Sequence, residues 1–149
     1  MEHWEAIESI SDTDDSERMT TGTLDVDVHA NTAVSKAIVR RFYEEVWLAQ
    51  KPEFIEKFVS EELTQHASDI QNGLAGLRRA INQEIGFQPE ILHRIVAQGD
   101  FVVVQLEGLR DGVPFVSYDV LRTKEGKIAE MWRVQQQIPN QMPHKNGMI

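Results

Sequence analysis

The sequence of 149 residues contains no cysteine, which excludes disulfide bonds, thiolate metal sites and a cysteine nucleophile. It also lacks any apolar run near the ~20 residues that a membrane-spanning helix needs, so we expect no contact with a membrane. The N-terminus has no basic stretch followed by an apolar one, and the sequence therefore predicts a cytoplasmic protein. At roughly 100–200 residues per domain, the length predicts one domain with a substantial core.

Basic residues are scarce as well: the chain has 15 Lys and Arg against 24 Asp and Glu, a formal net charge of −9. Nine of the acidic residues and a single basic residue lie within residues 1–30, which therefore carry a charge of −8. The rest of the chain has 15 acidic and 14 basic residues and is nearly neutral. Because phosphate binding needs a surplus of positive charge, the sequence argues against a nucleic-acid partner.

The same change in composition predicts the organisation of the chain. Residues 1–31 combine acids with Ser and Thr and contain few large apolar side chains, so we expect a flexible N-terminal extension. A short helix around Trp4–Ile10, docked on the body or on a partner chain, is the alternative. Residues 32–140 carry the periodic apolar pattern of a folded domain, and residues 141–149 form a C-terminal tail.

Helical spacing of apolar residues dominates the first half of the folded region. Asn31 or Thr32 suits the cap of a first helix, Pro52 suits the first turn of a second, short helix, and Gly86 suits the end of a third. A brief extended piece at Leu63–His66 separates the second helix from the third. The three helices are predicted over residues 32–49, 52–58 and 74–85.

Beyond Pro89 the apolar residues alternate, which predicts strands instead of helices. Two-residue turns at Gly99-Asp100 and Asp111-Gly112 are typical of antiparallel hairpins. Helices followed by such a meander indicate an α+β fold with a curved antiparallel sheet of about four to five strands. The four strands of the meander are predicted at about Ile91–Gln98, Phe101–Arg110, Val113–Thr123 and Ile128–Ile138.

The short turns also predict the register of the strands. In the first hairpin, Ile95 falls opposite Val104 and His93 falls opposite Leu106. In the second hairpin, Val104 falls opposite Asp119 and Leu106 opposite Ser117. If Thr123 faces Ile128 across the last turn, Asp119 falls opposite Trp132, Leu121 opposite Glu130 and Ser117 opposite Val134.

One face of the sheet is then apolar apart from four polar residues, His93, Ser117, Asp119 and Glu130. Trp132 lines this face in the predicted register, whereas Met131 and Arg133 point away from it. A carboxylate that faces the core is costly unless it is paired or hydrated. We therefore expect a cavity between the sheet and the helices, with Asp119 and Trp132 at its floor.

The opposite face of the predicted sheet carries a cross-strand row of Val96, Val103, Val120 and Met131. A sheet face that is half apolar and not covered by helices favours a homodimer interface. The alternative is the ordinary preference of β-branched residues for strands on a face that stays exposed.

Several segments of the chain resemble the SnoaL-like branch of the nuclear transport factor two-like superfamily. The similarity spans about Val34–Pro139 and lies in the order and spacing of short motifs. These are Val39-Arg-Arg-Phe-Tyr, Leu63-Thr-Gln-His66, Gly73-Leu-Ala-Gly-Leu, Val96-Ala-Gln-Gly-Asp-Phe, Ser117-Tyr-Asp-Val-Leu and Gln137-Ile-Pro139. The resemblance implies a cone-shaped α+β barrel with an internal apolar pocket, usually as a dimer. Members of the family include polyketide cyclases that perform aldol-type ring closures, related folds hold isomerases and epoxide hydrolases, and other members are binding or structural modules without known chemistry.

The resemblance also implies roles for individual residues. Asp119 matches the carboxylate that acts as acid or base in the cyclase-like members, and His66 matches the histidine of the Gln-His motif of the family. The family often shows His-Trp-Asp where this chain has Met131-Trp132-Arg133, a departure that weakens the assignment to the typical subgroup.

Each candidate residue has a functional and a structural interpretation. An apolar pocket makes a carboxylate a stronger base, so Asp119 could take a proton next to a carbonyl group; alternatively Arg or backbone groups hold it for architecture. His66 is either a proton shuttle at the pocket mouth or a structural histidine. His93 is either a second catalytic group or a core histidine with one hydrogen bond.

Four more residues are candidate ligand contacts on the same face. Trp132 and Tyr43 could stack on or hydrogen-bond a planar ligand, although large aromatic residues at such positions usually belong to the core. Ser117 lacks a triad that would make it a nucleophile, and Glu130 is most simply the partner of an arginine. No ligand spacing is typical of a metal site, and we expect neither a metal nor another cofactor.

Two hypotheses of function follow from the sequence. The first is an enzyme that performs cofactor-free acid/base chemistry, an aldol-type cyclisation or an isomerisation, on an apolar carbonyl compound, with Asp119 as base and His66 or His93 in support. The second is a non-catalytic ligand-binding or dimerisation module, in which a permanent partner holds Asp119. In both hypotheses we expect a small apolar molecule and a second copy of the chain as partners.

Overall fold

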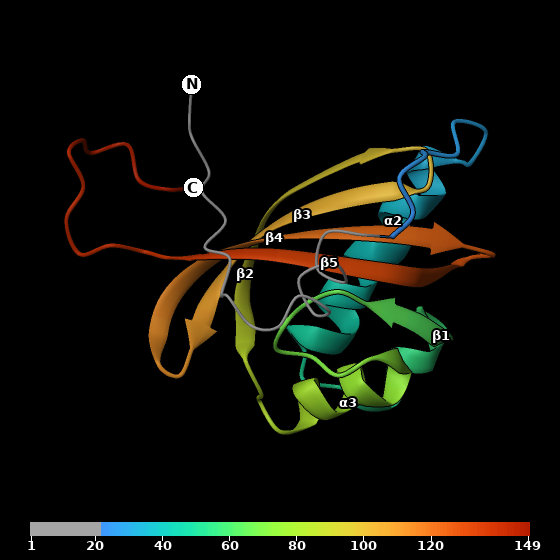
Figure 1. The fold of residues 1–149 in the computed structure, drawn as a ribbon, viewed down its shortest axis with the longest axis horizontal. Helices are drawn as coiled ribbons and strands as arrows, with labels where there is room; N and C mark the ends of the chain where they lie inside the picture. The colour runs from blue at the N-terminus through green and yellow to red at the C-terminus, as the bar shows by residue number, and fades with distance from the viewer. Residues whose placement is uncertain (1–21) are drawn as a thin grey trace.

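The computed structural model describes residues 22–149 (Figure 1). Its five strands form one sheet in the order β1-β5-β4-β3-β2, and α2 lies behind β4 and β5 in Figure 1, with α3 below them. The predicted α+β class is thereby confirmed. The elements are α2 (Thr32–Phe42), η1 (Tyr43–Trp47), η2 (Pro52–Lys57), β1 (Val59–Gln65), α3 (Gly73–Asn82), β2 (Phe87–Gln98), β3 (Phe101–Arg110), β4 (Val113–Lys124) and β5 (Lys127–Gln137).

The first helix begins where the sequence predicts it, because the Asn31 side chain accepts a hydrogen bond from the backbone N–H of Val34. Its last turn, Tyr43–Trp47, widens into a π-helix. Tyr43 and Trp47 therefore lie on the same buried side of the helix, with their rings stacked 5.8 Å apart. This stack brings the phenol of Tyr43 towards the middle of the sheet.

The third helix is shorter than predicted. It ends at Asn82, and Glu84 and Gly86 then adopt positive φ angles of 50° and 71° that turn the chain into β2. The strand consequently begins at Phe87, four residues before the predicted start at Ile91. Gly86 thus marks the entry to a strand and not the end of a helix.

The two-residue turns set most of the register as predicted. Val104 pairs with Ile95 on one side and with Asp119 on the other, and Leu106 pairs with Ser117. The predicted pair of His93 with Leu106 is wrong, because Leu106 faces Leu92 instead. The β2–β3 ladder shifts twice in this region, between Pro89 and Ile91 and between Leu92 and Arg94.

A β-bulge in β5 changes the predicted faces of the last strand. Thr123 faces Ile128, as predicted, but the next pair is Arg122 with Glu130, so that Ala129 is an extra residue in β5. Because side chains alternate along a strand, one extra residue exchanges the two faces of everything beyond it.

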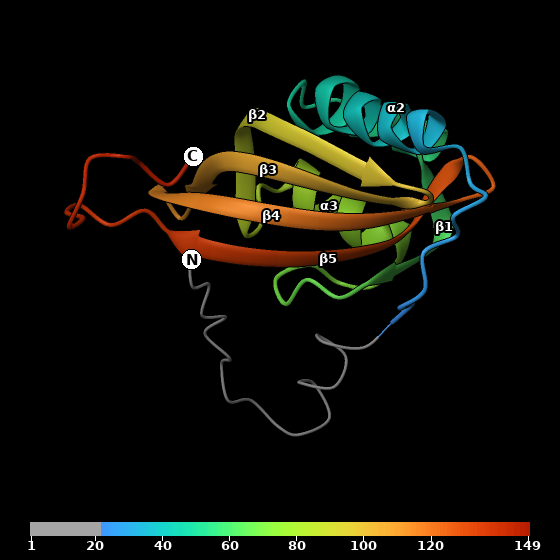
Figure 2. The same cartoon turned by 90° about the horizontal axis from the view of Figure 1, so that it is seen from above.

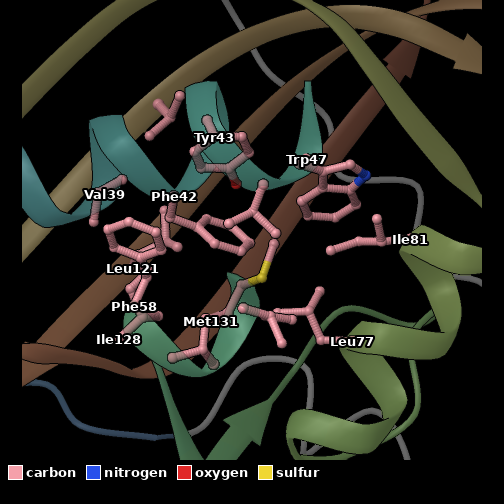
Figure 3. Packing of buried hydrophobic residues seen from close by; sticks show 14 of the residues in the cluster. Val39, Phe42, Tyr43, Trp47, Phe58, Leu77, Ile81, Leu121, Ile128 and Met131 are labelled. Carbon is pink, nitrogen blue, oxygen red and sulfur yellow. The ribbon is translucent and has the colours of Figure 1, made fainter. Parts of the chain in front are cut away.

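Asp119 consequently faces Arg133, not Trp132, and Leu121 faces Met131, not Glu130. The prediction that Met131 and Arg133 point away from the core is therefore wrong. Both are buried on the helix side, and the core view shows Met131 among the apolar side chains (Figure 3).

Side chains of the chain itself pack between the sheet and the helices (Figure 3). Phe42, Tyr43 and Trp47 pack there as a group, with Phe42 edge-on to both of the other rings. None of the three has exposed surface. The core continues through Val39, Ile55, Phe58, Leu63, Leu77, Ile81, Phe87, Val102, Val104, Leu106, Leu121, Ile128 and Met131.

The residues before α2, 22–31, form an arm at the end of the sheet where β2 ends (Figure 2). The arm is tied to the body by hydrogen bonds from Thr23 N to Glu130 Oε1 (3.2 Å) and from Asp27 N to Asp100 Oδ1 (2.8 Å). The helix predicted at Trp4–Ile10 lies outside the described residues. Within residues 22–149, no helix is both long and apolar enough to cross a membrane.

Candidate functional site

A polar cluster occupies the middle of the otherwise apolar interior. It consists of Tyr43 from the π-helical turn, Ser117 and Asp119 from β4, and Arg133 from β5. Arg133 binds the Asp119 carboxylate in a bidentate manner, with Nε 2.8 Å from Oδ1 and an Nη2 distance of 2.7 Å to Oδ2. The hydroxyl of Ser117 donates to Oδ1 (2.8 Å), and the phenol of Tyr43 donates a short hydrogen bond to Oδ2.

These four residues, which we call the Asp119 cluster, are closed off from solvent. Asp119 and Ser117 have no exposed surface, and the Arg133 side chain is 2% exposed. The guanidinium also lies over the rings of Trp47 and Phe87, at 4.8 Å and 5.2 Å from their centroids. The interior charge of Asp119 is thus balanced by one cation, which apolar rings hold in place.

The same contacts shift the pKa values of Tyr43 and Arg133. Burial, together with the neighbouring Asp119 charge, raises the pKa of Tyr43 well above its ordinary value of 10.0. Burial by itself would lower the pKa of Arg133, but the Asp119 carboxylate more than offsets this and raises it. Tyr43 is therefore a proton donor and Arg133 a cation across the physiological range.

The hydrogen-bonding capacity of Asp119 is fully used. An ionised carboxylate offers about four lone-pair sites, and here each oxygen accepts two hydrogen bonds. A base must have a lone pair free for the proton that it takes. In this conformation Asp119 has none.

Two residues that were predicted on the same face as Asp119 lie elsewhere. Glu130 and Trp132 are on the opposite face because of the bulge at Ala129. There they meet His66, whose ring stacks on Trp132 at 4.9 Å and whose Nε2 lies 2.9 Å from Glu130 Oε1. The structure therefore brings His66, Glu130 and Trp132 together, but apart from Asp119.

This outer cluster is held by further charges and by the arm. Arg122 Nε donates to Glu130 Oε2 at 3.0 Å. Burial alone would raise the pKa of Glu130, but hydrogen bonds from His66, Thr23 and Arg122 together lower it below its ordinary value of 4.5. Gly22 passes so close that any side chain there would collide with Glu130, Trp132 and His66.

The prediction that His93 faces the core is wrong. The irregular register of β2 turns it to the surface, where its Nε2 lies 3.0 Å from Glu107 Oε2. The side chain is part of an exposed pair on the rim of the sheet and does not approach the Asp119 cluster.

Sequence reasoning missed Arg133 as the partner of Asp119, and it missed Trp47 and Phe87 as the walls around that pair. One signal was available, since a carboxylate on a core position of a dry sheet needs a cation. Among residues 22–149, no group of three or more His, Cys, Asp or Glu side chains is arranged to hold a metal ion.

Comparisons with known proteins agree with this architecture. The model of the SnoaL-like domain matches residues 39–131. Three solved structures are similar to the chain: a protein from Kribbella flavida provisionally named a ketosteroid isomerase, an epoxide hydrolase from M. tuberculosis described as LEH-like, and an NTF-2 like protein of unknown function from Burkholderia xenovorans. No protein of curated function matches significantly.

The structural similarity extends over most of each protein. The Kribbella protein has a TM-score of 0.62 and 16% identity over 80% of this chain and 90% of its own. The epoxide hydrolase has a TM-score of 0.58 and 16% identity, with coverage of 70% and 84%. The Burkholderia protein has a TM-score of 0.62 and 12% identity, with coverage of 74% and 88%. At such identities the structures establish the fold alone, while the family model, which matches more than half of the sequence, shows that this chain belongs to the SnoaL-like domain family.

Proposed function

We propose that this chain is a non-catalytic member of the SnoaL-like family, in which the Asp119 cluster stabilises the interior and does not perform chemistry. The observation that carries the proposal is the saturation of the Asp119 carboxylate, which accepts four hydrogen bonds without exposed surface. An enzyme with Asp119 as base would need to break the bidentate pair with Arg133 for every turnover. Isomerase or hydrolase chemistry, which the names of two similar structures suggest, would require such an opening if Asp119 were the base.

Labelling of carboxylates tests this proposal on the full chain. A water-soluble carbodiimide with a small amine converts accessible carboxylates to amides, which peptide mass spectrometry locates. Asp119 should stay unmodified in the native protein and react only after unfolding, whereas exposed Glu53 should react at once. Native-state labelling of Asp119 at the rate of Glu53 would show that small molecules reach the carboxylate, and the catalytic hypothesis would then replace ours.

The partner that we propose is a second copy of the chain, bound through the outer face of the sheet. The register places Val96, Val103, Val120 and Trp132 in one cross-strand row on that face. Val96 is 62% exposed, and Val134, one row further, is 45% exposed. A two-fold axis would bring such a row against its own copy, which is the usual geometry of a homodimer. A small apolar ligand at the Asp119 cluster, in contrast, would meet side chains that have no exposed surface.

Light scattering after size exclusion tests the dimer. The full chain should elute with twice the monomer mass of 17.0 kDa, and Val96→Lys should shift it to the monomer. Ile85→Lys is the matched control, since Ile85 is also exposed but lies outside the sheet. A monomeric parent chain, or equal effects of both substitutions, would contradict the proposal.

A further inference from the structure

A cleft of about 410 Å³ lies at the end of the molecule where the arm, α2 and the β4–β5 hairpin meet. Asp27 and Ala30 contribute from the arm, Val34, Ser35 and Ile38 from α2, and Thr123–Gly126 from the hairpin. None of the residues of the Asp119 cluster lines it. Its volume is within the range that small-molecule sites occupy.

One wall of this cleft is apolar. Val34 and Ile38 are four residues apart on α2 and so lie on one face of the helix in successive turns, and Ala30 continues this wall into the arm. The Val34 side chain is half exposed, so its apolar surface is open to a ligand in the cleft. A short hydrocarbon chain would find contact along this wall.

The lining of the cleft includes a carboxylate, that of Asp100, for which residues 22–149 supply no cation. Asp100 is 7% exposed, and its Oδ1 accepts the hydrogen bond from Asp27 N. Within residues 22–149, no Lys, Arg or His nitrogen lies within ion-pair distance of it. Carboxylates with so little exposure are normally paired.

The remaining charges around the cleft leave it negative. Arg122 lines the cleft but is already paired with Glu130. Asp27, Asp100 and Glu125 then stand against Lys124 alone. A buried hydroxyl pair, Thr123 Oγ1 to Ser35 Oγ at 2.9 Å, adds acceptor oxygens beside the carboxylates.

We propose that this cleft binds a primary alkylammonium compound. The ammonium group, with its three donors, pairs with Asp100 and Asp27 and hydrogen-bonds the hydroxyl of Ser35, while the alkyl chain lies along Val34 and Ile38. The ligand supplies the cation that Asp100 lacks among the described residues. The site is separate from the Asp119 cluster and does not depend on the function proposed for it.

A titration of the isotope-labelled full chain, followed by amide NMR, tests the site with n-butylammonium as probe. The amides of Ser35, Asp100 and Thr123 should shift saturably, with a Kd of about 1 mM, which is realistic for a ligand of five heavy atoms. Butyrate and n-butanol match the probe in length but lack the positive charge, and they should leave these amides unchanged.

Two substitutions with opposite expected effects sharpen the test. Asp100→Asn keeps the acceptor for Asp27 N but removes the charge, and should weaken binding at least tenfold. Lys124→Gln removes the competing cation and should strengthen binding a few-fold. Asp111→Asn, in the exposed β3–β4 turn, is the control and should change nothing. The proposal is overturned by the absence of saturation, by an equal response to butyrate, or by parent-like binding in Asp100→Asn.

Discussion

Removal of either partner of the Asp119–Arg133 pair should destabilise the protein severely, whereas removal of both should cost much less than the sum. Asp119→Leu leaves the Arg133 guanidinium, 2% exposed, without its counter-charge. Arg133→Met leaves the carboxylate with only the hydroxyls of Tyr43 and Ser117. In the double variant no uncompensated charge remains in the interior.

The expected magnitudes follow from the burial of the pair. Loss of one partner of a buried ion pair costs about 3–5 kcal/mol, a large part of the total stability of about 5–15 kcal/mol of an ordinary domain. Replacement of the whole pair by apolar side chains is nearly neutral in itself, but the hydroxyls of Tyr43 and Ser117 each lose an acceptor, at about 1–3 kcal/mol. The double variant should therefore lose roughly 2–6 kcal/mol, against about 6–10 kcal/mol for two independent losses.

Urea unfolding of the four proteins at neutral pH measures this coupling, provided that the denaturant slope is the same in all four. The exposed pair Arg40–Glu44 on α2 provides a matched control cycle, in which the coupling should be no more than about 0.5 kcal/mol. Additive losses at Asp119 and Arg133, within about 0.5 kcal/mol, would refute the reasoning that the two charges stabilise the interior as one unit.

Three further predictions concern acid, alkali and the arm. Because the pKa of Glu130 is lowered in the folded state, Glu130→Gln should reduce the free energy of unfolding at neutral pH. In acid titrations, the difference between the parent chain and this variant should vanish as the pH falls below 4.5, and a constant difference would contradict the prediction. Since burial raises the pKa of Tyr43, the contribution of this residue to the free energy of unfolding should be fully present below pH 10.0 and decrease above it. In a Tyr118→Phe background, where Tyr43 is the remaining tyrosine, tyrosinate absorbance should appear only with unfolding and not before it. Gly99 has a φ of 58°, and a Cβ added there would lie 2.2 Å from the Asp27 carbonyl oxygen, so Gly99→Ala should cost about 1–2 kcal/mol from the backbone alone and speed hydrogen exchange at Asp27 N. Unchanged exchange would mean that the arm is not anchored there.

The part of the fold that the sequence predicted well is the part that short turns determine. Asp111-Gly112 admits few hairpin geometries, so counting outward from it placed Asp119 beside Val104 correctly. The burial of Asp119 followed from the alternation of β4, and Ser117 was placed beside it for the same reason. Local chemistry was sufficient there because no bulge intervenes between β3 and β4.

The candidate site could not be completed in this way, because its partner depends on one extra residue. Nothing in the segment Ile128-Ala129-Glu130 distinguishes a regular strand from a bulged one. The bulge placed Arg133 instead of Trp132 in the interior, where its guanidinium forms a buried ion pair with Asp119. The π-helical turn that contains Tyr43 and Trp47 could not be predicted from the sequence either, since the apolar residues there fit an α-helix and a π-helix equally well.

The pairing of β1 with β5 has a consequence for the order in which the molecule assembles. The neighbours β2 to β5 are joined by short turns, so their ladders close small loops, whereas β1 must wait for the last strand of the meander, β5, which follows α3 and three other strands in the sequence. During synthesis from the N-terminus, β1 remains an unpaired edge until β5 has left the ribosome. The strand that supplies Arg133 to the interior is thus also the one whose arrival incorporates β1 into the sheet, so that burial of the ion pair and closure of the sheet belong to the same late step of folding.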